Sequence, residues 1–282
     1  MKNKRLLLLY AHPDDEILGP GGAVAQYANQ GVHVELVVAT RGEAGEISDP
    51  ALATPETLGE VREQEMRCAA DTLGINCVTY LGYRDSGMEG SADNQNPRAY
   101  INSDSAEAVS RLVENIRRVR PHVILTFEPF GGYGHPDHKT IHKQALLAVP
   151  AAADPGYRPD LGWPWATPRV FYPLVRRVTL LAMKEYMAAR DLDVSFFEDL
   201  DKRRAESWPD DLYHVTLDVG DAVGQKLAAF RCHATQFGLD SLFRRLPDEE
   251  MAQVLRYEYF AQALPEPEPG LRLDGLFDGL AD

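Results

Sequence analysis

Short apolar runs alternate with longer segments of helical periodicity along much of the chain. The runs of strand length lie at 5–10, 32–39, 76–81, 122–127 and 169–174. The helical segments lie at 17–30, 55–73, 104–120, 137–149, 183–190 and 219–232. Strands that alternate with helices are typical of crossover connections in a parallel sheet. The pattern predicts an α/β fold with a Rossmann-like, mostly parallel sheet flanked by helices.

Breaks in this periodicity come at glycine and proline. Gly31 and Gly74 stand where the C-caps of two helices are expected, and Pro121 ends a third helix. The stretch 151–168 is rich in proline, glycine and tryptophan, so we expect an irregular excursion over the sheet. The tail after residue 264 contains PEPEPGLRLDG and is expected to be weakly ordered.

Composition narrows the class of protein. The 282 residues include 29 basic and 43 acidic ones, and the net charge of -14 repels a phosphate backbone, which argues against a nucleic-acid partner. The apolar run 6–9 is shorter than the roughly 7 to 15 residues of a secretory signal. Later apolar windows fall short of the roughly 18 residues of a membrane span. We expect a soluble, cytoplasmic protein with no membrane partner.

The cysteines give no sign of a covalent framework. Cys68, Cys77 and Cys232 are an odd number and include no CxxC pair. This spacing indicates neither a disulfide framework nor a cysteine-based zinc site. Buried free thiols are the expectation.

Polar motifs follow the predicted strands. They are AHPDDE at 11–16, TRGEAGE at 40–46, GYRDSGM at 82–88 and GGYGHPDH at 131–138. Ligands of open parallel sheets gather outside the carboxyl ends of the strands. We therefore expect these motifs to meet at one edge of the sheet.

Two of the motifs combine histidine with aspartate. A hydrolytic zinc site takes three ligands from His, Asp or Glu and leaves one position for water, and these motifs supply that set. Taken alone, Asp14 or Asp15 could be the N-cap of the following helix. His135 and His138 could likewise lie exposed in a glycine-rich turn, although side chains three residues apart share a helix face. The presence of both clusters favours the metal site.

The motifs occur together in one known family. The chain resembles the LmbE-like, or PIG-L, de-N-acetylases, which include the deacetylases of mycothiol and bacillithiol synthesis. The resemblance spans at least residues 5–149, and KLAAFRCHATQ at 226–236 is similar to the C-terminal pattern of the family.

The resemblance assigns roles to particular residues. His12, Asp15 and His138 match the metal ligands, with zinc the expected ion and ferrous iron the alternative. Asp14 matches the general base. His135 and Tyr133 match positions that polarise the carbonyl and stabilise the oxyanion, with His135 protonated. Either Asp14 or His135 could protonate the leaving amine.

Substrate contacts are also implied. Arg62 and Asp85 match positions that bind the sugar, with a surface salt bridge as the alternative interpretation. Arg41 and Glu43 are expected to line the pocket or to brace the metal ligands.

The resemblance thus implies a zinc-dependent deacetylase acting on an N-acetylglucosaminyl small-molecule glycoside. An amidase of thiol S-conjugates is a less favoured alternative because Gly19 stands where those amidases carry lysine. A metal-dependent phosphoesterase would need more carboxylates. We expect a catalytic core at 1–174 and a C-terminal portion at 175–282 that completes the same domain and shapes the substrate pocket. A homo-oligomer is left open.

Overall fold

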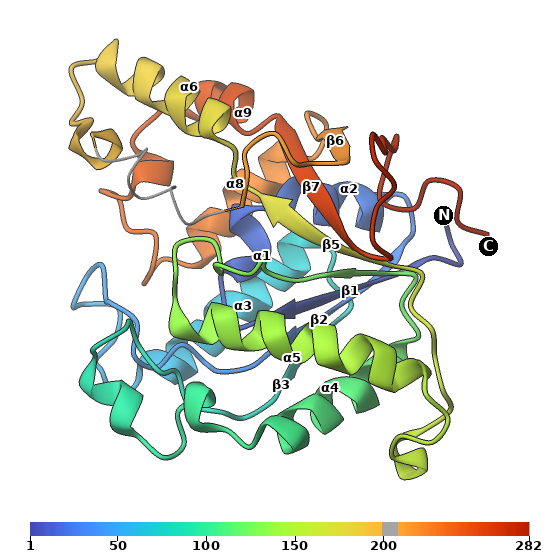
Figure 1. Ribbon diagram of the computed structural model, residues 1–282. Helices are drawn as coiled ribbons and strands as arrows, with labels where there is room; N and C mark the ends of the chain where they lie inside the picture. The colour runs from blue at the N-terminus through green and yellow to red at the C-terminus, as the bar shows by residue number, and fades with distance from the viewer. Residues whose placement is uncertain (199–207, 282) are drawn as a thin grey trace.

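The protein is built around a seven-stranded sheet with the order β3-β2-β1-β4-β5-β7-β6. The computed structural model describes residues 1–198 and 208–281 (Figure 1). The strands are β1 (Arg5–Tyr10), β2 (His33–Val38), β3 (Cys77–Tyr80), β4 (Val123–Leu125), β5 (Arg169–Leu174), β6 (Val215–Asp218) and β7 (Tyr257–Leu264). The strands β1 to β5 pair in parallel, whereas β7 pairs antiparallel with β5 and β6. The predicted α/β fold with a mostly parallel sheet is confirmed.

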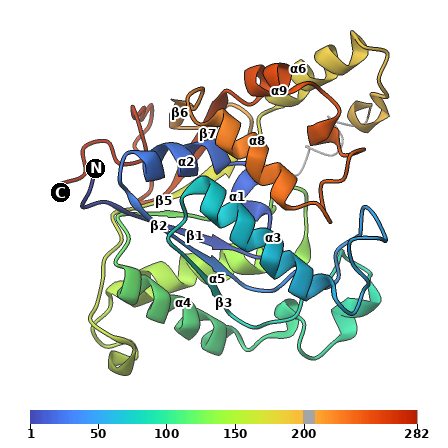
Figure 2. The ribbon, with the colours of Figure 1, turned by 180° about the vertical axis from the view of Figure 1, so that it is seen from behind.

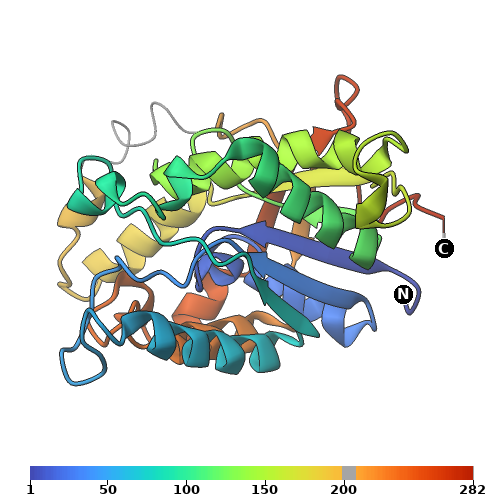
Figure 3. The same ribbon diagram turned by 90° about the horizontal axis from the view of Figure 1, so that it is seen from below.

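The longer helices are α2 (Gly21–Asn29), α3 (Leu58–Leu73), α4 (Ser105–Val119), α5 (Pro136–Ala153), α6 (Arg177–Ala188), α8 (Val223–Cys232) and α9 (Asp248–Val254). Four residues, Asp15–Leu18, form α1. Figure 1 shows α4 and α5 over one face of the sheet, and Figure 2 shows α2, α3 and α8 over the other. Figure 3, seen from below, shows the sheet between its two layers of helices.

The central strand β1 supplies both halves of the core. Leu6, Leu8 and Tyr10 pack into the cluster under α2, α3 and α8. The intervening Leu7 and Leu9 pack into the cluster under α4 and α5. Successive side chains of a strand point to opposite faces, so a strand buried on both sides reads as the continuous apolar run RLLLLY.

The helix predicted at 17–30 is broken in two. It stops at Leu18 and restarts at Gly21, with Pro20 at the N-cap of α2. The backbone N–H groups of Gly22 and Ala23 donate to the two oxygens of Glu258, each at 2.8 Å. A carboxylate from β7 therefore caps the second helix, a contact that the local sequence does not reveal.

Two other predicted helix boundaries were wrong. The helix expected to end at 149 continues through Pro150 to Ala153, which shortens the irregular excursion. The helix expected at 183–190 begins earlier, at Arg177. None of the helices in the described ranges is long and apolar enough to cross a membrane.

The C-terminal portion contains more regular structure than expected. The strands β6 and β7 and the helix α9 were not predicted, and β7 continues the sheet from β5. Beyond β7, Leu276 and Phe277 are buried in the core. The division into a core at 1–174 and a C-terminal portion stays a prediction.

The expectation of buried free thiols was wrong. Cys68 of α3 and Cys232 of α8 form a disulfide, and Cys77 is a free, exposed cysteine. The bonded pair is 164 residues apart in sequence and meets because α3 packs against α8 (Figure 2). Spacing rules based on nearby cysteines do not detect such a pair.

Candidate metal-binding active site

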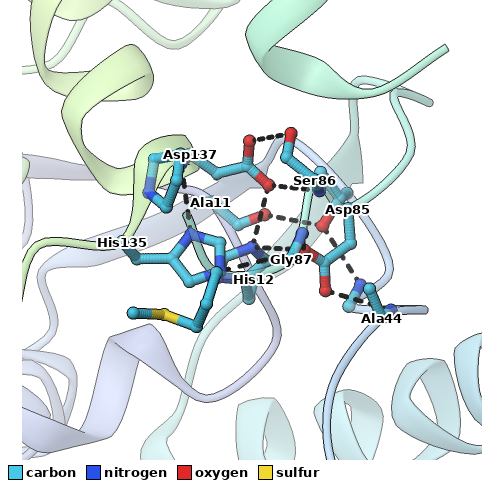
Figure 4. A network of polar contacts seen from close by, with 12 residues as sticks. Ala11, His12, Ala44, Asp85, Ser86, Gly87, His135 and Asp137 are labelled. Carbon is cyan, nitrogen blue, oxygen red and sulfur yellow. Dashed lines mark hydrogen bonds and ion pairs between the residues drawn. The ribbon is translucent and has the colours of Figure 1, made fainter. Parts of the chain in front are cut away.

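The predicted motifs meet at the carboxyl edge of the sheet. His12 follows β1, Asp85 follows β3, and His135 and His138 lie at the start of α5 beyond β4. Figure 4 shows His12 between Asp137 and Asp85, with His135 beside it. The two termini lie at the opposite end of the molecule (Figure 1).

Three side chains converge at this edge as the sequence predicted. The Nδ1 of His12 lies 3.1 Å from the Nε2 of His138, and that Nε2 lies 3.2 Å from the Oδ1 of Asp15. The second oxygen of Asp15 accepts hydrogen bonds from the backbone N–H groups of Ala11 and His12, at 3.0 and 2.8 Å. All three side chains are buried. The carboxylate is therefore held in place by the turn that carries it.

Both histidines are anchored through the nitrogen that points away from this group. The Nε2 of His12 lies 3.2 Å from the Oδ2 of Asp137, and the Nδ1 of His138 lies 3.0 Å from the carbonyl oxygen of Gly131. A carbonyl oxygen only accepts hydrogen bonds, so the Nδ1 of His138 carries a proton. In a neutral ring the Nε2 then carries no proton and presents its lone pair. Bonds to an acceptor behind the ring are the usual way in which proteins orient metal-binding histidines.

This arrangement fits a divalent cation. With both outer nitrogens protonated, the nitrogens of His12 and His138 that face each other at 3.1 Å present two lone pairs. A proton or a metal cation between them makes that contact favourable, and the Asp15 carboxylate adds a negative charge on the same side. Two nitrogens and a carboxylate are a donor set that zinc prefers.

The fully buried Asp137 was not singled out by the sequence analysis. Besides holding His12, its carboxylate accepts the backbone N–H of Ser86 at 2.9 Å and a short hydrogen bond from the Ser86 hydroxyl (Figure 4). The only signal was its position between the two histidines of HPDH. The described residues offer two overlapping groups at metal-binding distances: His12 with His135 and His138, and His12 with Asp85 and Asp137. Neither group includes the third predicted ligand, Asp15.

Charges at the site favour a bound cation. Burial raises the pKa of Asp15, but His138 and His12 outweigh it and hold the pKa at about 2. Burial lowers the pKa of His12, yet Asp85 and Asp137 raise it well above its ordinary value. The cluster therefore carries an excess of carboxylate charge that a metal ion would neutralise.

Asp14 has a strained backbone beside this cluster. Its φ of 114° lies in the region that favours glycine, a conformation that costs on the order of 1–3 kcal/mol. The carboxylate of Glu16 accepts the Asp14 N–H at 2.9 Å, and Arg62 donates to the Asp14 Oδ2 at 3.1 Å. Burial raises the pKa of Asp14 to about 6, although Arg62 opposes the rise. The turn thus presents a carboxylate whose pKa lies close to neutral pH.

His135 is the N-cap of α5. Its Nδ1 accepts the backbone N–H of Asp137 at 3.1 Å, so the proton of the neutral ring lies on Nε2. Burial, followed by the neighbouring His12 and His138, lowers the pKa of His135 to about 3. The lowered pKa favours a neutral ring with its N–H on Nε2, whereas the family resemblance implies a protonated one; the role of His135 stays a prediction.

Tyr133 is 58% exposed, and its ring lies 5.0 Å from that of His138 in an edge-on arrangement. Burial, followed by the nearby carboxylates of Asp15 and Asp14, raises the pKa of the Tyr133 hydroxyl well above its ordinary value, so the hydroxyl lies close to these carboxylates although the residue is exposed.

The predicted sugar-binding residues differ in how exposed they are and in how many internal hydrogen bonds they make. Arg62 is buried and, besides Asp14, donates to the carbonyl oxygens of Pro13 at 2.5 Å and Gly42 at 2.9 Å. Asp85 is buried too, and its oxygens accept the backbone N–H groups of Gly87 and Ala44.

Arg41 is the most accessible of these residues. Its side chain is 42% exposed and pairs with Glu43 at 3.3 Å and Glu63 at 3.5 Å. Arg62 and Asp85 thus hold the backbone of loops around the site through hydrogen bonds. Arg41 is more exposed to solvent.

The same motifs and fold occur in known proteins. Residues 7–149 match the family model described as PIG-L: GlcNAc-PI de-N-acetylase. The 1D-myo-inositol 2-acetamido-2-deoxy-alpha-D-glucopyranoside deacetylase of Geodermatophilus obscurus is 40% identical over 269 residues, or 92% of this chain and 91% of that protein.

Two solved structures share the fold at lower identity. The N,N'-diacetylchitobiose deacetylase of Pyrococcus horikoshii has a TM-score of 0.65 and 20% identity over 92% of this chain and 84% of its own. The 4-carboxy-2-hydroxymuconate hydratase of Pseudomonas putida has a TM-score of 0.63 and 20% identity over 95% and 99%. Because a deacetylase and a hydratase share it, the fold alone does not fix the reaction. The family match and the identity to the first relative do fix the family, and the chain belongs to the PIG-L family of de-N-acetylases.

Proposed function

We propose that the protein is a metal-dependent hydrolase that removes the acetyl group from an N-acetylglucosaminyl-inositol glycoside. One observation carries the proposal: a buried pair of facing histidine nitrogens beside Asp15, with the strained backbone and raised pKa of Asp14 next to it. Family membership supports the reaction class. The substrate class rests on the name of the relative that is 40% identical over most of both chains.

His12, Asp15 and His138 would hold the ion, which we take to be zinc with ferrous iron as the alternative. When bound, such an ion polarises the amide carbonyl and lowers the pKa of water toward about 7. Asp137 and the Gly131 carbonyl keep the two histidines in the ligating tautomer.

Asp14 acts as the general base. It takes a proton from the attacking water as the new C–O bond to the acetyl carbon forms. A base is most effective when its pKa lies near the working pH, and burial brings Asp14 to about 6. Arg62 fixes the carboxylate from one side and so sets its direction.

The oxyanion of the tetrahedral intermediate accepts hydrogen bonds from His135 and Tyr133. His135 donates through Nε2, because its Nδ1 is already engaged by the α5 N-terminus. Donors of this kind are worth roughly 3 to 4 kcal/mol each in the transition state. Tyr133 supplies the second donor, because its hydroxyl is close to the carboxylates of Asp15 and Asp14.

Collapse of the intermediate breaks the C–N bond and releases acetate and a free amine. Asp14 returns its proton to the amine nitrogen, since the low pKa of His135 makes that ring a poor carrier of a second proton. We infer that the exposed Arg41 contacts the sugar. Arg62 and Asp85 contribute hydrogen bonds to the sugar through the capacity that their internal contacts leave free. The C-terminal portion at 175–282 would shape the rest of the pocket.

A substrate panel tests the proposal. Free-amine release is measured with N-acetylglucosaminyl-inositol, N-acetylglucosaminyl-malate, free N-acetylglucosamine and a thiol S-conjugate amide, and release of inorganic phosphate is measured with a phosphomonoester. Asp14→Asn is the matched inactive control. The proposal expects the highest kcat/KM on the inositol glycoside. Preferential cleavage of the S-conjugate or of the phosphomonoester would replace it by one of the two alternatives.

A further inference from the structure

A buried histidine from the C-terminal portion reaches the turn that carries Asp14. His233 follows α8 directly and is fully buried. Its Nε2 lies 2.8 Å from the Oε1 of Glu16, which is fully buried as well. The other oxygen of Glu16 accepts the backbone N–H of Asp14 at 2.9 Å. A continuous chain of contacts therefore runs from His233 through one carboxylate to the backbone of Asp14.

The Glu16 carboxylate must accept a hydrogen bond from a strained part of the backbone. It satisfies the N–H of a residue whose φ of 114° places the peptide in an uncommon orientation. A carboxylate with one bonded oxygen can still rotate about its terminal torsion, which is soft. His233 fixes the second oxygen, so the plane of the carboxylate and the direction of the acceptor to Asp14 are both determined.

Within the described residues the His233 side chain makes no hydrogen bond besides the one to Glu16, because its buried Nδ1 has no partner. A buried polar atom without a partner is unfavourable, so an apolar side chain would serve packing better at this position. The ring therefore makes a single hydrogen bond, to Glu16 beside the site, and leaves its Nδ1 unsatisfied.

The segment that carries His233 is anchored on both sides. Cys232 is bonded to Cys68 of α3. The N–H and hydroxyl of Thr235 donate to the two oxygens of Glu65, also in α3, at 2.7 and 2.6 Å. The imidazole is thus presented to Glu16 from a rigid support.

We propose that His233 is a positioning residue for deacetylation: through Glu16 it holds the backbone of Asp14 in the orientation that aims the general base. The proposal rests on the proposed function of Asp14. It predicts that loss of the His233 ring nitrogen lowers kcat, because the direction of Asp14 changes, while the groups that contact the substrate and the metal are left in place.

The test compares three variants of the full-length, metal-loaded protein. His233→Phe keeps a flat, bulky ring without a donor, and His233→Gln places an amide near the former Nε2. His214→Phe is the control, because His214 is buried and lies just before β6, away from the carboxyl edge of the sheet. Its side chain accepts one hydrogen bond, from the Gln262 N–H at 2.9 Å. Each is assayed for kcat, KM, zinc content and thermal midpoint.

The proposal expects His233→Phe to lower kcat about 10- to 100-fold with KM and zinc content unchanged, and His233→Gln to recover most of the loss. His214→Phe should lower only the thermal midpoint. A full kcat in folded His233→Phe, or an equal loss in the two phenylalanine variants, would overturn it. Absence of amine release by the unmodified protein would instead overturn the proposed function.

A double-mutant cycle with Glu16 adds a second, independent measurement. If His233 acts through Glu16 alone, Glu16→Ala and Glu16→Ala/His233→Phe have the same kcat. Losses that multiply in the double variant would mean that His233 acts by another route, and the proposal would fail.

Discussion

Replacing Asp14 by asparagine removes the base and changes little else. Asparagine tolerates positive φ, so the 114° backbone is kept, and its amide oxygen can still accept from Arg62. Arg62 also keeps its bonds to two backbone carbonyls. General-base catalysis contributes about 10²- to 10⁴-fold, and a pKa of about 6 places Asp14 toward the upper end. A loss of roughly 10³-fold or more corresponds to about 4 kcal/mol or more of transition-state stabilisation.

Acetate release at saturating substrate measures this loss, and zinc content is measured on the same samples. Asp15→Asn is the matched variant, since it is the same substitution one residue along the turn. Asp14→Asn should bind zinc like the unmodified protein and lose turnover, while Asp15→Asn should lose zinc. Equal zinc loss in the two variants, or near-normal kcat in zinc-loaded Asp14→Asn, would refute the division of roles between the two aspartates.

Three further predictions concern the support of the site. Asp137→Ala should weaken zinc binding about 10- to 100-fold, because His12 loses the acceptor behind its ring, and competition with a chromogenic chelator measures this; unchanged affinity would contradict the role. Arg62→Lys should lower kcat and leave zinc content unchanged, because lysine cannot span the three oxygens that Arg62 contacts. Measurement of kcat and of zinc content on the same samples tests this, and an unchanged kcat would contradict it. Cys68→Ser should lower the free energy of unfolding by about 2–4 kcal/mol without reductant, measured by urea titration, and an unchanged midpoint would argue against the disulfide.

Local patterns predicted the parts of the fold that are locally encoded. The run RLLLLY gave β1 at its observed bounds because a strand buried on both faces is apolar throughout. The strands β6 and β7 were missed because strand formation there depends on partners far away in sequence. Pairing of Val170 with Leu264 is one such contact.

The candidate site divides in the same way. His12, Asp15 and His138 were selected from motif and strand-end position, and the structure brings them together, although their roles as ligands stay predictions. Asp137 lay inside a recognised motif, but its bond to His12 appears only when β1 and α5 are placed side by side. The contact of His233 with Glu16 spans 217 residues, and no periodicity encodes it.

The most direct test of the central claim is a metal titration of the chelator-treated protein against acetate release from N-acetylglucosaminyl-inositol. Zinc, or ferrous iron under anaerobic conditions, is added in fractions of an equivalent while the initial rate is recorded. We predict no turnover without metal and a rate that rises linearly to a plateau at about one equivalent, as expected for one site with three protein ligands. Full activity of the metal-free protein, or a plateau that needs two equivalents, would contradict the account.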